Sequence, residues 1–411
     1  MKIVDSLNLF HKAVIFCLLT VSIVTILGFS TGYGATEKQA VLALIGAQDS
    51  LLVVDTNGEI VISKNHTQQL LPASILKLFT SLVAIHYLGP EYRYHTEFFI
   101  DKNSNLKIKG FGDPLLISEI VRDISRLLTA LLGQTAIIND LVVDDTYFIQ
   151  PLTIPGVSSS LQPYDAPNGA LCVNFNTVFF KSSHSGYTSA EPQTPLLGFA
   201  EKIIHKRKLK TGRIVLSHVE KENTIYAGKL FEYFLKQEGV QIRGKVTPGK
   251  VNYTHDRLIF RYTSRFSLTE IISKLLEHSN NFTTNQLLIT AGTKAFGPPG
   301  NLAKGVEAAM AYASRELAIA DMTIVEGSGI ARQNRVSARQ MMRVLEAFEP
   351  NFVLLRQQGR DFYKTGTLHG INTRAGYITS KNGGRYRYVV MLNTPGKSTK
   401  PIMRQLLKVL E

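Results

Sequence analysis

Hairpin signals near both ends of the chain constrain its fold more than any other feature. Residues 50–65, SLLVVDTNGEIVISKN, contain two β-rich runs around a Thr-Asn-Gly turn, and residues 373–393 contain a second strand pair around an Asn-Gly turn. A helical pattern follows each pair, and further helices lie between them. We therefore expect an α+β fold, in which helices pack on an antiparallel sheet built from both chain ends.

The middle of the chain has a different pattern of secondary-structure signals, which predicts an inserted domain. From residue 96 to residue 262, short β-prone runs are separated by Gly, Pro and Asp. We assign this segment to a large, mostly β insert with one or two helices, so that residues 36–95 and 263–411 form the two parts of the main domain. Helical signals return with a capping box of Ser267 and Glu270. Further helices are expected at about 302–318 and 337–348.

The first 35 residues have the pattern of a targeting segment. Lys2 and Lys12 flank the start of an uncharged stretch, residues 13–29, and small residues follow it. This pattern is typical of a signal peptide that is cleaved near Gly34 or Ala35, and an uncleaved membrane anchor is the alternative. Both interpretations predict export to the periplasm or another extracytoplasmic cell-wall space, with membrane association if the segment is retained.

Charge and cysteine content narrow the partners of an exported chain. Without residues 1–35 the chain has 44 basic and 31 acidic residues, and this net charge of +13 favours a cell-wall polymer or a membrane surface. Nucleic acid is disfavoured because the basic residues are scattered, apart from HKRKLK at 205–210. Cys172 would be the only cysteine, so no disulfide could form within the chain. The ten histidines show no metal-ligand spacing, and we expect neither a metal nor another cofactor.

The first candidate catalytic residues lie at the start of the helix predicted within residues 70–89. Ser74 and Lys77 are three positions apart, so a helix places the lysine amine beside the serine hydroxyl. A lysine can take the proton of a serine if burial or another cation lowers its pKa. The spacing alone is weak evidence, because Ser104 and Lys107 repeat it in a polar, turn-like segment.

Two further motifs occur in order along the chain. Ser279 and Asn281 lie at the end of a predicted helix, and the run Lys364-Thr365-Gly366 lies before the C-terminal strands. With Ser74 and Lys77, these residues resemble the S-x-x-K, S-x-N and K-T-G motifs of the serine penicillin-binding proteins and β-lactamases.

The long insert makes the resemblance more specific. Ser74 and Ser279 are 205 positions apart. This long separation, together with segments such as EGSGIARQNRVSARQM at 326–341, resembles the class C low-molecular-weight penicillin-binding proteins. Members of that family are D-alanyl-D-alanine carboxypeptidases and endopeptidases. Two features depart from the family pattern: the insert is shorter than usual, and Asn280 occupies a position where Asp is common.

The resemblance implies a role for each matching residue. Ser74 would attack the carbonyl carbon of the penultimate D-alanine of a peptidoglycan stem peptide, and Lys77, held neutral by Lys364, would take the proton. Ser279 would relay a proton to the departing amine. Asn281 would hold Lys77 and the substrate backbone.

The third motif is expected to bind the substrate. Lys364 and the hydroxyls of Thr365 and Thr367 would bind the terminal carboxylate, and Gly366 would let the substrate lie close to the strand. The backbone N–H groups of Ser74 and Thr367 would form the oxyanion hole. A β-lactam inhibitor would acylate the same serine.

Two alternatives to a serine D-Ala-D-Ala carboxypeptidase remain open. A serine β-lactamase would need a group that activates the deacylating water, and the sequence shows no candidate glutamate for this task. An inactive peptidoglycan-binding module would use only the fold and its charge. The intact motifs favour the carboxypeptidase, and an endopeptidase acting on a cross-link would present the same bond to the same serine.

Overall fold

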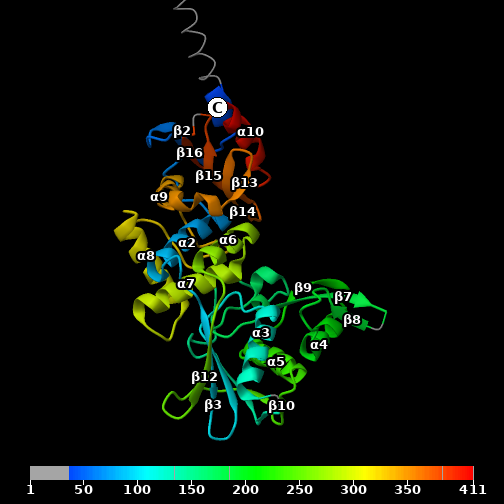
Figure 1. Cartoon of the computed structure of the whole chain (residues 1–411). Coiled ribbons are helices and arrows are strands. Elements are labelled where there is room, and N and C mark those ends of the chain that lie inside the picture. The colour runs from blue at the N-terminus through cyan, green and yellow to red at the C-terminus, as the bar shows by residue number, and fades with distance from the viewer. Residues whose placement is uncertain (1–36, 134, 185, 382, 411) are drawn as a thin grey trace, which may run out of the picture.

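The computed structural model describes residues 37–133, 135–184, 186–381 and 383–410. Figure 1 shows the strands from the two chain ends at one end of the molecule, a group of helices in the middle, and the inserted segment at the other end. The expected signal peptide or anchor, residues 1–35, lies outside the described residues.

The main sheet joins the two ends of the chain. Its six strands are antiparallel and have the order β13-β14-β15-β16-β1-β2. Their bounds are β1 Asp49–Val54, β2 Ile60–Lys64, β13 Arg356–Gln358, β14 Asp361–Leu368, β15 Ile371–Thr379 and β16 Arg385–Leu392. Leu51 of β1 lies opposite Val390 of β16. The predicted sheet from both chain ends is therefore confirmed.

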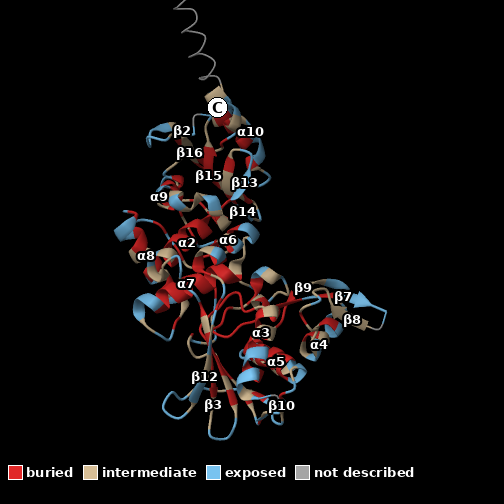
Figure 2. Ribbon diagram, viewed as in Figure 1, coloured by how far each residue is buried: buried red, intermediate tan, exposed pale blue. Residues whose placement is uncertain are grey.

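Helices cover both faces of this sheet. Strand β1 shows why, because its alternate side chains are apolar on both faces and both sets are buried. Leu51 and Val53 belong to a core shared with helix α10 (Thr399–Val409), whereas Leu52 and Val54 belong to a larger core on the opposite face. Helix α9 (Ala338–Phe348) packs on that opposite face. Figure 2 shows the resulting concentration of buried residues along the sheet and the helices beside it.

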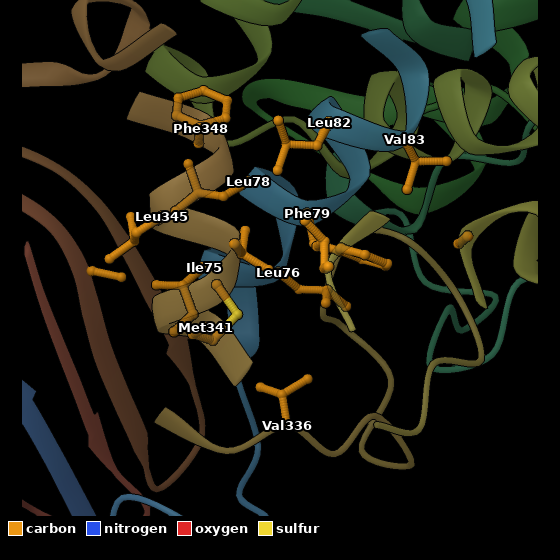
Figure 3. Packing of buried hydrophobic residues seen from close by; sticks show 14 of the residues in the cluster. Ile75, Leu76, Leu78, Phe79, Leu82, Val83, Val336, Met341, Leu345 and Phe348 are labelled. Carbon is orange, nitrogen blue, oxygen red and sulfur yellow. The ribbon is translucent and has the colours of Figure 1, made fainter. Parts of the chain in front are cut away.

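Helix α2 (Leu76–Leu88) lies in the large core, and the 3₁₀ turn η1 (Ala73–Ile75) leads directly into it. Its buried side chains, such as Leu78, share this core with Met341, Leu345 and Phe348 of α9 (Figure 3). Three further helices complete the group, namely α6 (Leu268–His278), α7 (Asn281–Phe296) and α8 (Leu302–Glu316). The capping box predicted at the start of α6 is present.

The inserted segment has its own core and contains more helix than the sequence predicted. Its larger sheets have the orders β11-β6-β4-β3-β12 and β8-β7-β9, and β5 pairs with β10. The strands are β3 His95–Ile100, β4 Leu106–Gly110, β5 Ile137–Ile138, β6 Leu141–Asp144, β7 Thr177–Ser183, β8 Gly186–Ser189, β9 Thr211–Val215, β10 Gln241–Ile242, β11 Val246–Pro248 and β12 Arg257–Thr263. The helices are α3 Ser118–Leu132, α4 Gly198–Arg207 and α5 Glu222–Gln237. Three helices thus replace the one or two expected, because α3 buries a full apolar stripe against the strands.

The described ranges contain neither a membrane-spanning helix nor a metal-binding cluster. None of the helices there is both long enough and apolar enough to cross a bilayer. In the same part of the chain, no cluster of three or more His, Cys, Asp or Glu side chains has an arrangement suited to a metal ion.

Candidate active site

Ser74 and Lys77 lie within hydrogen-bond distance of each other. The sequence predicted Ser74 in the first turn of an α-helix, but the structure places it in η1, directly after Ala73, whose φ of 47° is left-handed. Lys77 belongs to the first turn of α2, and its Nζ lies 3.0 Å from Ser74 Oγ. Residues three apart are eclipsed in a 3₁₀ turn, so this local geometry places the hydroxyl over the amine.

The Lys77 amine is buried and has two carbonyl partners besides Ser74. Its Nζ donates to Asn281 Oδ1 and to the main-chain oxygen of Ser328, at 2.7 Å in both cases. Burial lowers the pKa of Lys77 well below its usual value, and the charge of Lys364 lowers it further, while Glu326 acts in the opposite direction. The site therefore favours the neutral amine, which is the form that can accept a proton.

Ser279 and Asn281 are held at the junction of two helices. Ser279 ends α6 with a left-handed φ of 54°, and α7 begins at Asn281. The residue between them, Asn280, caps α7, since its Oδ1 accepts a hydrogen bond from Thr283 N at 2.8 Å. Asn and Asp are both strong N-cap residues, so the departure at Asn280 keeps the junction intact.

Lys364 projects from β14 toward the second motif. Its Nζ donates to Ser279 Oγ at 2.8 Å and to the main-chain oxygen of Thr365 at 2.9 Å. Burial, together with the nearby charge of Arg356, lowers the pKa of Lys364 to about 8. Lys364 is thus mostly cationic near neutral pH, and this cation lies close enough to influence Lys77.

Gly366 allows the nucleophile turn to approach the sheet. A Cβ atom at this position would lie 2.6 Å from Ser74 N and 2.9 Å from Ala73 Cβ. The turn is also tied to the next strand, because Thr373 Oγ1 of β15 donates to Pro72 O at 2.7 Å. The sequence analysis assigned Gly366 to the approach of substrate, and the structure adds that the serine's own turn needs a glycine here.

Thr365 and Thr367 are exposed and alternate along β14 with the buried Lys364 and Gly366. Strand β13 pairs only with residues 361–363 of β14. Among the described strands, the edge of β14 beyond these residues therefore has no partner. An extended peptide could add to this free edge through main-chain hydrogen bonds.

The loop of residues 326–331 also contributes to the site. Ser328 is buried, and its main-chain oxygen is one of the Lys77 partners. Glu326, two residues earlier, is buried as well. The segment EGSGIARQN marks this loop in the sequence, but a role played by a main-chain oxygen has no side-chain signature.

The fold and the three converging motifs define an enzyme of the penicillin-binding and β-lactamase-like class. Comparison with known families is more specific: the chain belongs to the D-Ala-D-Ala carboxypeptidase 3 (S13) family, which matches residues 38–358. It is therefore a low-molecular-weight penicillin-binding protein and a serine-type carboxypeptidase, as the sequence predicted.

Named relatives agree with this assignment. The D-alanyl-D-alanine carboxypeptidase of Actinomadura sp. (strain R39) is 26% identical, over 83% of this chain and 77% of the relative. Penicillin-sensitive carboxypeptidase A of Dictyostelium discoideum is 22% identical, over 84% of this chain and 82% of the relative.

A solved structure supports the fold. Penicillin binding protein 4 (dacB) from Haemophilus influenzae superimposes with a TM-score of 0.74 at 18% identity, covering 90% of this chain and 97% of that protein. The predicted penicillin-binding fold is therefore confirmed.

Proposed function

We propose that this carboxypeptidase cleaves the D-Ala-D-Ala bond of peptidoglycan stem peptides through an acyl-enzyme on Ser74. The observation that carries the proposal is the buried Lys77 amine, which lies 3.0 Å from Ser74 Oγ and has a lowered pKa. Family membership supports the reaction, and the site geometry supports the role of each residue.

Acylation begins with proton transfer from Ser74 to Lys77. Ser74 Oγ forms a bond to the carbonyl carbon of the penultimate D-alanine as its proton passes to the neutral Lys77 amine. The N–H groups of Ser74 and Thr367 stabilise the oxyanion, and a single such donor is worth roughly 10²- to 10³-fold in rate.

Release of D-alanine then uses the second amine. Ser279 Oγ gives its proton to the leaving nitrogen as the C–N bond breaks, and Lys364 Nζ, 2.8 Å away, replaces that proton. In deacylation a water attacks the ester, its proton returns to Lys364 through Ser279, and Lys77 reprotonates Ser74 Oγ. Both lysines thereby regain their starting states.

The substrate lies along the free edge of β14 in this proposal. The Lys364 ammonium and the hydroxyls of Thr365 and Thr367 bind the terminal carboxylate, while Asn281 contacts the peptide backbone. An endopeptidase reaction on a cross-linked peptide would use the same groups. A solved relative with a TM-score of 0.53, a predatory peptidoglycan endopeptidase from Bdellovibrio bacteriovorus, supports this second activity.

A β-lactam is expected to acylate Ser74 and to remain bound. The Haemophilus influenzae protein has also been solved with a β-lactam, which supports penicillin binding here. Efficient β-lactam turnover needs a base for the deacylating water. Glu326 is the carboxylate that acts on Lys77, but six donors already occupy its oxygens, which argues against the β-lactamase alternative.

The test combines covalent labelling with product analysis. Ser74→Ala should lose labelling by a fluorescent penicillin, and its release of D-alanine from defined monomeric and cross-linked muropeptides, followed by mass, should fall by roughly 10⁴- to 10⁶-fold. Ser104→Ala is the matched control, because it removes the serine of the repeated spacing in the insert. Labelling that persists in Ser74→Ala would refute the assignment, and steady nitrocefin turnover by the unaltered protein would favour a β-lactamase. Sedimentation with peptidoglycan without release of D-alanine would favour the inactive module.

We also propose export to the periplasm or a similar cell-wall space, with residues 1–35 acting as a cleaved signal or a membrane anchor. The uncharged stretch at 13–29 and the substrate of the family support this location. The N-terminal mass of the protein from fractionated cells tests it: a start near residue 35 or 36 in the soluble fraction supports cleavage. An intact N-terminus in the membrane fraction supports an anchor.

A further inference from the structure

Glu326 is a fully buried carboxyl group that the proposed mechanism does not use. Six hydrogen bonds reach it from described residues. Oε1 accepts from Gly329 N at 2.7 Å, Asn334 Nδ2 at 2.8 Å and Ala331 N at 3.3 Å, and Oε2 accepts from Ser328 N at 2.6 Å, Ser328 Oγ at 2.7 Å and Asn285 Nδ2 at 3.1 Å. All six groups donate, which matches the acceptor-only character of a carboxylate. The loop of residues 326–331 is therefore folded around this one side chain.

The same loop is pressed against the segment that carries the nucleophile. Gly329 has a φ of +81°, and a Cβ atom there would lie 1.9 Å from Ala73 O, next to Ser74. Thr80 Oγ1 of α2 donates to Gly327 O at 2.7 Å, and Gly327 N donates to Asn285 Oδ1 of α7 at 2.8 Å. Contacts from two helices and from the internal carboxylate thus fix the position of the loop.

The main-chain oxygen of Ser328 matters because of the hydrogen-bonding groups of a neutral amine. Such an amine has two N–H groups and one lone pair. Asn281 Oδ1 and Ser328 O can only accept, so they take both N–H groups of Lys77, each at 2.7 Å. The lone pair then faces the third partner, Ser74 Oγ, at 3.0 Å. If the Ser328 oxygen moved, the amine could rotate and turn its lone pair away from the proton that it must accept.

We propose that Glu326 is a positioning residue of this site: its carboxylate folds the 326–331 loop so that the Ser328 oxygen aims the Lys77 lone pair at Ser74 Oγ. The inference rests on the proposed role of Lys77 as the base. Glu326 does not touch the substrate, and it acts through the loop that it organises.

The charge of Glu326 gives the proposal a second, separable consequence. Among the described residues, the charged groups that act on Lys77 are Lys364, which lowers the pKa of Lys77, and Glu326, which raises it. Removing the Glu326 charge should therefore lower the pKa of Lys77 further. The base would then be neutral at lower pH, so the acid limb of the acylation rate should move to lower pH.

Two variants distinguish the effect of the position of the loop from the effect of the Glu326 charge. Glu326→Gln removes the charge and, in either amide orientation, sets an NH₂ group against three donors. Glu326→Asp keeps the charge, but its side chain is one methylene too short to reach all six donors. We expect a loss of about 10- to 100-fold in acylation rate for both variants, because an error of about 1 Å in a reacting group costs on this order. The acid limb should move down by about one pH unit in the Gln variant alone.

The measurement is the single-turnover rate of acylation by a fluorescent penicillin from pH 4.5 to 9, with sites counted by saturating label so that unfolded protein does not contribute. Asp144→Asn is the matched control. Asp144 is also buried and accepts hydrogen bonds from Lys109, Thr146 and Val251, but it lies in the inserted segment. This variant should lose stability while its acylation rate and acid limb stay as in the unaltered protein.

Each outcome decides one question. If Ser74→Ala still labels, the proposed function fails, whatever the Glu326 variants do. If labelling depends on Ser74, a Gln variant with an unchanged rate, or with a reduced rate and an unmoved acid limb, overturns the role of Glu326. If the Gln variant does not fold, Glu326→Asp decides alone: an unchanged rate overturns positioning, and a loss of tenfold or more in the labelled sites supports it.

Discussion

Substitution of Gly366 by alanine tests whether the nucleophile turn must lie directly against β14. The added methyl group would lie 2.6 Å from Ser74 N, 2.9 Å from Ala73 Cβ and 2.4 Å from Thr373 Oγ1. Ser74 N is a main-chain atom and cannot rotate away as a side chain can. To restore an ordinary contact of about 3.6 Å, the turn and the strand must separate by about 1 Å at this point.

The magnitude of the effect follows from that displacement. A shift of about 1 Å in a catalytic group costs on the order of 10²-fold in rate. Loss of one oxyanion donor costs about 10² to 10³, and Ser74 N is a proposed donor. We therefore expect Gly366→Ala to reduce acylation by about 10²-fold or more, with an overpacking cost of about 1–3 kcal/mol in the free energy of unfolding.

The assay is the second-order rate constant for labelling by a fluorescent penicillin, together with thermal unfolding. Gly384→Ala is the control and lies in the turn that leads into β16 of the same sheet. Its added Cβ would meet only side-chain atoms, chiefly Thr56 Cγ2 at 2.5 Å, and Thr56 is exposed. Labelling of Gly366→Ala at close to the unaltered rate would refute the proposed position of the oxyanion hole. An equal loss of labelling in both variants would show that the effect comes from damage to the sheet.

Three further predictions concern charge and packing. Since the pKa of Lys364 is about 8, the ammonium proposed to bind the substrate carboxylate is lost as pH rises through this value. KM for a stem peptide should therefore increase above pH 8, and Lys364→Arg should move that increase to higher pH. Burial raises the pKa of Asp113 to about 6, so the folded chain holds this proton more tightly than the unfolded chain and loses stability as pH rises from about 4 to 6. Asp113→Asn should therefore stabilise the protein by up to about 3 kcal/mol at pH 7.5 and by much less at pH 4, measured by denaturant unfolding at both pH values. Phe79→Ala should cost about 3–5 kcal/mol in the same assay, because this ring is 1% exposed in the large core.

Local chemistry explains which parts of the fold could be predicted from the sequence. The hairpins and the capping box at Ser267 depend on residues close together in the chain, and both are present. Helix α7 was missed because every residue from Phe282 to Thr293 is buried, so its sequence shows no alternation between a polar and an apolar face. Helix α3 was missed because its stripe lies in a segment otherwise rich in strand signals.

The site was predictable where side chains carry the chemistry, and not where the main chain does. The three motifs could be recognised as residues, and the structure brings Ser74, Lys77 and Asn281 into one hydrogen-bonded group. The Ser328 oxygen could not be found in this way, because any residue at that position would supply it. Its position depends on the glutamate two residues earlier, and that dependence becomes visible only when the loop is seen in three dimensions.

The family resemblance assigned the base role to Lys77, but the spacing of the residues alone gives no physical reason why the two lysines should differ. Both amines are buried, but Lys77 has no exposed surface and has Lys364 as a cationic neighbour, whereas Lys364 is 4% exposed and has a pKa of about 8. Two like charges in one site cannot both be favoured, so the more deeply buried amine gives up its proton first. This difference in environment supports the proposal that Lys77 is the base beside Ser74 and that Lys364 is the cation beside Ser279. Equal spacing in the sequence, as at Ser104 and Lys107, cannot create this difference without the burial and the second amine.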